Sequence, residues 1–102
     1  MLDKVVFATT KNEYLKGVYQ NPADIPKTYE SVSCDFTDEL EFAIIKKLQV
    51  ELKYWNSKNL LHSIRGQIID IYTENHEEFL KMSNLTKVRL DRIASVHILN
   101  VH

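Results

Sequence analysis

Residues 37–82 read TDELEFAIIKKLQVELKYWNSKNLLHSIRGQIIDIYTENHEEFLKM, and this stretch decides the fold that we expect. Its apolar residues recur at steps of three and four, with one polar interruption at residues 56–59. Such spacing is typical of two amphipathic helices joined by a short turn. The sequence therefore predicts an antiparallel helical hairpin at the centre of the domain.

The first predicted helix begins at Thr37, whose hydroxyl can accept a hydrogen bond from a backbone amide of the first turn. Asp38 and Glu39 place negative charge at the positive end of the helix dipole. The apolar face that follows consists of Phe42, Ile45, Leu48, Leu52 and Trp55.

The second predicted helix follows the polar residues 56–59, where Ser57 or Asn59 can cap it. Its apolar face consists of Leu61, Ile64, Ile68, Ile71, Tyr72 and Phe79. Gly66 interrupts this face, and a glycine inside a regular element often marks a close approach of another backbone. We interpret Gly66 as a site of close helix packing.

The flanking segments are richer in β-branched and aromatic residues. Residues 4–10 and 14–19 predict an N-terminal β-hairpin, and residues 31–36 alternate as a brief strand would. Residues 85–94 fit either a helix or a strand, whereas residues 95–102 predict a strand that can close the sheet. The expected fold is therefore α+β, with the β-hairpin and a closing C-terminal strand packed on the helical hairpin, in one domain over residues 1–102.

The composition is that of an ordinary globular chain. Of the 102 residues 44% are hydrophobic and 26% are charged, and the net charge is −1. A charge so close to zero gives no overall attraction to nucleic acid or to an anionic membrane. Cys34 is the lone cysteine, which suits a reducing cytoplasm and predicts a small buried side chain. With no apolar run long enough for a signal peptide or a membrane span, we expect a soluble cytoplasmic protein.

No catalytic, cofactor-binding or metal-binding motif stands out. Asp70, Glu74 and Glu77 would share one face of the second predicted helix, which is interpreted as a solvated face rather than a metal site. His76 lacks the second histidine, four residues on, that a zinc-protease motif needs. An enzyme that uses Asp70, Glu74 or His76 is the third hypothesis, and it would require a cleft that collects these side chains.

The leading functional hypothesis is a small, non-enzymatic accessory or regulatory protein that binds a protein partner. It would be of the inhibitor or adaptor type, such as viruses and plasmids encode, and it would also associate with itself. The positive argument is an excess of apolar residues beside the two predicted helical faces, at Leu40, Val50, Leu60 and Ile69. Apolar side chains that a small domain cannot bury tend to form contact sites.

The alternative hypothesis is a dimeric regulator that binds nucleic acid. Residues 80–102 hold four Lys or Arg residues and one Asp, so this segment carries a charge of +3. Lys87, Arg89 and Arg92 are its candidate phosphate contacts.

Overall fold

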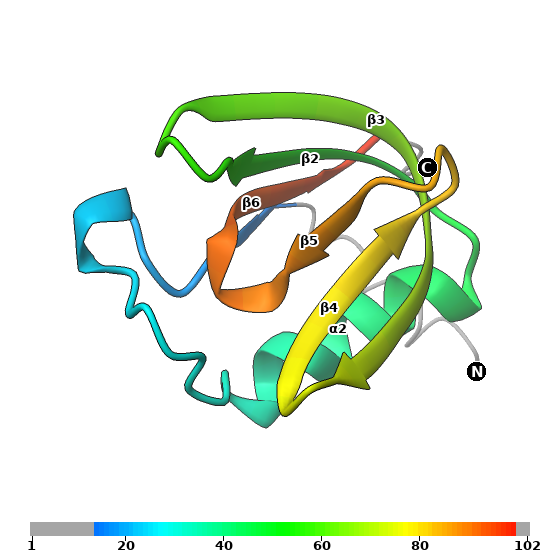
Figure 1. The fold of residues 1–102 in the computed structure, drawn as a ribbon. Coiled ribbons are helices and arrows are strands. Elements are labelled where there is room, and N and C mark those ends of the chain that lie inside the picture. The colour runs from blue at the N-terminus through cyan, green and yellow to red at the C-terminus, as the bar shows by residue number, and fades with distance from the viewer. Residues whose placement is uncertain (1–13, 100–102) are drawn as a thin grey trace.

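The structure is a computed structural model that describes residues 14–99. Along the chain its elements are β1 (Tyr14–Lys16), the 3-10 turn η1 (Pro22–Asp24), α2 (Cys34–Ile45), β2 (Gln49–Trp55), β3 (Leu61–Glu74), β4 (Glu77–Met82), β5 (Lys87–Arg89), the 3-10 turn η2 (Leu90–Arg92) and β6 (Ile93–Ile98). An antiparallel sheet of six strands and one α-helix therefore make up the described part of the chain (Figure 1). The predicted helical hairpin is wrong, because most of residues 37–82 form strands.

The predicted first helix is wrong beyond Ile45, where the α-helix ends. Lys47 takes a left-handed backbone conformation with φ 54°, and the amide of Leu48 donates to the carbonyl of Ala43 at 3.0 Å. A residue with positive φ is a common way to terminate a helix. The helix also begins earlier than predicted, because its N-cap is Ser33, whose hydroxyl accepts from the amide of Phe36 at 3.2 Å.

Strand β2 shows why the helical interpretation of the spacing failed. Val50 and Leu52 are completely buried, Glu51 between them is half-buried, and Gln49 and Lys53 on either side are exposed. This alternation has a period of two, which is the signature of a strand with one buried face. The four-residue step from Leu48 to Leu52 fits a helix and a strand equally well, so spacing alone selected the wrong element.

Strand β3 is the longest element and joins the two halves of the sheet. Residues 61–67 pair with β2 and residues 68–74 pair with β4. Gly66 lies near the change of partner with φ 154°, and a Cβ atom there would come within 2.8 Å of the hydroxyl of Ser83. The close approach that the sequence suggested at Gly66 is thus made by Ser83, directly after β4, and not by another helix. Asn75 and His76, both with positive φ, form the tight turn into β4.

The order of the strands across the sheet is β1-β6-β2-β3-β4-β5. Strands β5 and β6 are joined by only three residues of η2, although three other strands separate them in this order. The sheet must therefore curl until its ends approach each other, as Figure 1 shows. Within residues 14–99 the result is a small, partly open barrel whose two edge strands, β1 and β5, are short, and short edges limit unwanted pairing with other chains.

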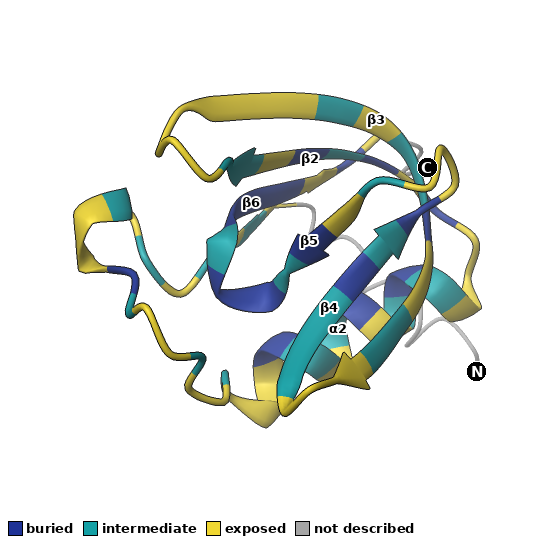
Figure 2. Ribbon diagram, viewed as in Figure 1, coloured by how far each residue is buried: buried dark blue, intermediate teal, exposed yellow. Residues whose placement is uncertain are grey.

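Helix α2 packs its apolar side against this curled sheet. Phe36, Leu40 and Ala43 are buried in one cluster with residues from β2, β3, β4, η2 and β6. In Figure 2 buried residues concentrate on α2, β4, η2 and β6, while the turns, the connection before α2 and much of β3 are exposed. Burying an aliphatic side chain of this kind stabilises the fold by about 1.5–3 kcal/mol.

The remaining predictions for the flanking segments have mixed outcomes. Residues 95–98 belong to β6, which pairs with β1 in the register Tyr14 to His97. Residues 31–36 are not a strand, because α2 begins at Cys34. Cys34 is exposed, so its prediction as a buried side chain is wrong. The first strand of the predicted N-terminal hairpin, residues 4–10, lies outside the described residues.

Candidate functional site

The three basic residues predicted to contact phosphates each make contacts within the chain. Lys87 lies on β5 and pairs with Glu74 at 2.6 Å, and its ammonium group also sits 4.2 Å from the centre of the Phe79 ring. Arg92 on η2 donates to the backbone carbonyl of Asn56 at 3.0 Å and to the side chain of Asn59 at 3.2 Å. Each therefore holds part of the chain's own structure.

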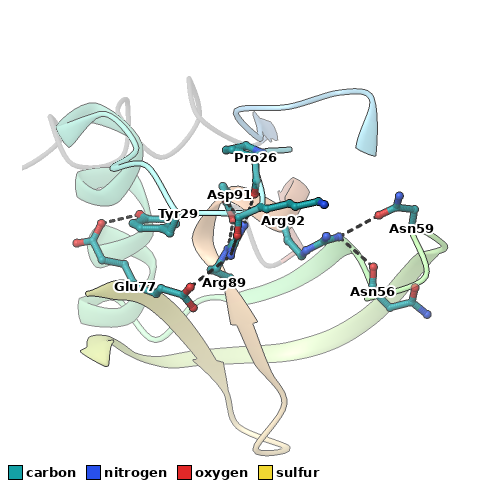
Figure 3. A network of polar contacts seen from close by, with 10 residues as sticks. Pro26, Tyr29, Asn56, Asn59, Glu77, Arg89, Asp91 and Arg92 are labelled. Atoms are coloured by element: carbon teal, nitrogen blue, oxygen red, sulfur yellow. Dashed lines mark hydrogen bonds and ion pairs between the residues drawn. The ribbon is translucent and has the colours of Figure 1, made fainter. Parts of the chain in front are cut away.

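Arg89 is the most constrained of the three (Figure 3). Its guanidinium group donates to both carboxylate oxygens of Asp91, at 2.6 and 2.9 Å, and Asp91 is completely buried. It also donates to the carbonyl of Pro26 at 2.8 Å and to that of Lys27 at 3.3 Å, and it lies 3.5 Å from a carboxylate oxygen of Glu77. Hydrogen bonding to Asp91 raises the pKa of Arg89. This network ties the connection before α2 to the β5–η2 corner.

Tyr29 reinforces the same attachment. Its hydroxyl donates to a carboxylate oxygen of Glu78 on β4 at 2.6 Å, and the guanidinium of Arg89 lies 5.7 Å from the centre of its ring. Burial, together with the bond to Glu78, raises the pKa of Tyr29 above its ordinary value. We conclude that Tyr29, Arg89 and Asp91 form a structural clamp, and we call this group the polar clamp.

The acidic residues weighed as a metal or enzyme site lie on two strands and not on one helix face. Asp70 and Glu74 are on β3, Glu77 is on β4 opposite Glu74, and His76 occupies the exposed turn between these strands. Within residues 14–99 no group of three or more histidine, cysteine or acidic side chains is placed to hold a metal ion.

An exposed apolar surface lies at the end of the β2–β3 hairpin. Leu60 and Leu61 are 58% and 50% exposed, and Leu61 pairs with the half-buried Trp55 across the hairpin. The turn is fixed by Asn56, whose side-chain oxygen accepts from the amides of Lys58 and Leu60 at 2.8 and 3.0 Å. We call Trp55, Leu60 and Leu61 the tip surface.

The indole of Trp55 adds a second unusual feature to this end of the hairpin. Its Nε1–H group is buried and finds no acceptor among residues 14–99. Buried donors are satisfied in most folded proteins, and local violations of this rule tend to occur at functional or strained places.

A second apolar surface lies between α2 and β3. One hollow is lined by Glu41, Ile44, Ile45, Asp70 and Ile71, and the adjoining one is lined by Ile44, Lys47, Gln67, Ile68 and Ile69. The two hollows share Ile44, so they form one shallow groove, which we call the isoleucine groove. Ile45 is 73% exposed and Ile69 is 45% exposed along it.

Of the four apolar residues that were expected to exceed what the core can bury, two are buried and two are exposed. Leu40 and Val50 are buried in the core, whereas Leu60 contributes to the tip surface and Ile69 to the isoleucine groove. Leu61 and Ile45 were missed as surface residues because both were assigned to buried helical faces. A hairpin interpretation of the polar residues 56–59 would have placed Leu60 and Leu61 at an exposed turn.

The comparisons with protein families and with curated proteins identify no relative of this chain. No protein-family model matches the chain, and no curated protein is significantly similar to it. None of the helices in residues 14–99 has the length and apolar character needed to span a membrane.

Proposed function

We propose that this chain is a small, non-enzymatic accessory or regulatory protein that acts in the cytoplasm by binding a protein partner. The partner would dock on the tip surface, and the protein would also associate with itself. An inhibitor or adaptor would work in this way, because its activity consists of occupying or bridging other proteins. A single cysteine, which allows no disulfide within the chain, supports the cytoplasmic placement.

The observation that carries this proposal is the exposure of Leu60 and Leu61 beside Trp55. Two adjacent leucines on a rigid hairpin turn give a partner apolar area at little cost in conformational entropy. Tryptophan is enriched among the residues that contribute most to protein interfaces. The turn needs no rearrangement to present these side chains, since Asn56 already holds it in place.

The proposal is tested by binding of the full-length chain. The wild-type protein, immobilised on a resin, is exposed to lysate of its source cell, and retained proteins are identified by mass spectrometry. The partner is then purified and titrated by calorimetry against the wild type and against Leu60→Asp/Leu61→Asp. We expect the double variant to bind at least about tenfold more weakly, because charge replaces buried apolar surface.

The control is Asn84→Asp, an exposed position in the turn between β4 and β5, which should bind the partner as the wild type does. Far-UV circular dichroism establishes that both variants are folded. The proposal fails if no protein is retained above the level of bare resin, or if the double variant binds the purified partner with unchanged affinity.

Nucleic-acid binding through Lys87, Arg89 and Arg92 stays the alternative prediction. These side chains would have to leave their contacts with Glu74, Asp91 and Asn56 to reach phosphates. A titration of arbitrary duplex DNA at increasing salt separates the two functions, because phosphate contacts lose affinity steeply with salt and apolar contacts do not.

A further inference from the structure

The isoleucine groove carries charges of opposite sign at its two ends. Glu41 and Asp70 lie at one end and Lys47 lies at the other, with Ile45 and Ile69 between them. The helix runs antiparallel to β3 here, so that Lys47 is level with Gln67 while Glu41 is level with Asp70. The groove thus has an acidic end, an apolar middle and a basic end.

Among the residues that the structure describes, these charged side chains have no partner of opposite charge. Within residues 14–99, Glu41, Lys47 and Asp70 make no ion pair or side-chain hydrogen bond. Lys81 lies across from Asp70 on β4, yet these two side chains form no ion pair. Protein interfaces commonly have an apolar centre and a polar rim, and the exposed isoleucines with the charged residues at either end have this arrangement.

The groove is also fixed in shape before any partner arrives. The side-chain amide of Gln67 donates to the backbone carbonyl of Lys47 at 3.1 Å, which attaches the end of α2 to β3. The backbone amide of Gln67 donates to the hydroxyl of Ser83 at 3.2 Å. A prearranged surface loses less conformational entropy on binding than a mobile one.

We propose that the isoleucine groove binds the same groove of a second copy of this chain, forming a two-fold symmetric dimer. A two-fold axis perpendicular to the groove turns one groove end for end relative to the other, so the acidic end of each copy faces Lys47 of its partner. The apolar middle parts then cover each other around Ile45 and Ile69. The inference rests on the self-association included in the proposed function, but it uses a surface separate from the tip surface.

The size of the groove sets the expected strength of the dimer. A standard stable interface buries about 800 Å² on each partner, with 20–30 residues on each side. The groove has nine lining residues, so the dimer should be weak, with a dissociation constant in the micromolar range. Such a dimer forms and separates with concentration.

The test is the solution mass of the full-length chain by sedimentation equilibrium, from low micromolar to about 500 µM. We expect the mass to rise from the 12.0 kDa of one chain toward twice that value. Glu41→Lys and Lys47→Glu should each weaken the dimer at least about fivefold, because each places like charges together. The combined variant E41K/K47E should recover part of the lost affinity relative to either single variant, because positions 41 and 47 again carry opposite charges while Asp70 is unchanged.

The rescue separates a direct contact from a general effect on folding, since both residues are exposed and a merely structural role would not be restored by the exchange. The inference is overturned by a mass that stays at 12.0 kDa throughout, by single variants that dimerise as the wild type does, or by an exchange that restores nothing. The partner titration with Leu60→Asp/Leu61→Asp keeps the two failures apart. A wild type that stays monomeric but whose partner binding is weakened by Leu60→Asp/Leu61→Asp removes this inference alone. A wild type that dimerises but whose partner binding is unchanged by that double substitution removes the tip surface alone.

Discussion

Two segments lie against the curled sheet, and different forces hold them there. Helix α2 is held by apolar burial, with Leu40 and Ala43 almost completely removed from water. The connection of residues 17–33 has few buried apolar side chains and is held by the polar clamp, through the carbonyl of Pro26 and the hydroxyl of Tyr29. Apolar packing is non-directional and tolerates small shifts, whereas the clamp depends on the geometry of a few bonds. The two attachments should therefore fail in different ways.

The largest effect is expected from breaking the polar clamp at its centre. Arg89→Met leaves the buried carboxylate of Asp91 without its partner, which should destabilise the fold by about 3–5 kcal/mol. Urea unfolding followed by fluorescence of Trp55 measures this loss. Arg89→Met/Asp91→Leu should recover part of it, because no buried charge then remains. A single variant as stable as the wild type would show that the clamp is dispensable.

The apolar attachment is tested by Leu40→Ala, which removes a side chain that is 1% exposed. We expect a loss of about 2–5 kcal/mol, because the surrounding side chains fill the resulting cavity only in part. Thermal unfolding by circular dichroism gives the value, and Glu41→Ala, one residue further along the helix and exposed, is the control. Equal melting temperatures for the two variants would contradict the packing of α2.

A smaller effect with a pH signature is expected at Tyr29. Tyr29→Phe removes the hydrogen bond to Glu78 and should cost about 1 kcal/mol at neutral pH. Because the pKa of Tyr29 is raised in the folded protein, its contribution is fully present below about pH 10 and decreases as the pH rises further. Urea titrations between neutral pH and the alkaline limit should show this decrease in the wild type and a weaker one in the variant. Parallel pH curves would remove Tyr29 from the clamp.

The smallest expected effect is a gain in stability, and it concerns Glu39 on α2, the segment held by apolar burial. Burial and the neighbouring carboxylates of Asp35 and Asp38 raise the pKa of Glu39 on α2. A raised carboxyl pKa means that the ionised form is disfavoured by folding, so Glu39 costs stability once the pH exceeds its folded pKa. Glu39→Gln should therefore raise the melting temperature slightly at pH 7 and lose this advantage below pH 4, as calorimetry can measure. A lower melting temperature at pH 7 would show that the charge is stabilising there.

Some of this fold was predictable from the sequence. The apolar spacing from Leu40 to Ile44 does belong to a helix, the polar residues 56–59 do mark a turn, and residues 95–98 do form a strand. The type of element on either side of the turn was wrong, because the step from Leu48 to Leu52 satisfies both periods. Only the burial of Val50 and Leu52, with exposed residues on either side, decides between a helix and a strand, and burial depends on the rest of the fold.

The sites were less predictable than the elements. Arg89 and Asp91 are two residues apart in the sequence, yet nothing in the sequence shows that Asp91 is completely buried. The positive charge of residues 80–102 therefore suggested a phosphate surface where the chain builds its own clamp. The exposure of Ile45 follows from the end of α2 at that residue, which the helical interpretation placed ten residues later.

The position of β6 between β1 and β2 also has a consequence for synthesis of the chain. Among the described residues, the three residues of β1 pair with β6 alone, and one side of β2 pairs with the same strand. A nascent chain on the ribosome can form α2 and the β2–β3 hairpin early, but it cannot complete the sheet until residues 93–98 have emerged. Folding is therefore expected to finish late and in one cooperative step, with the strands on both sides of the missing β6 open to chaperones until then.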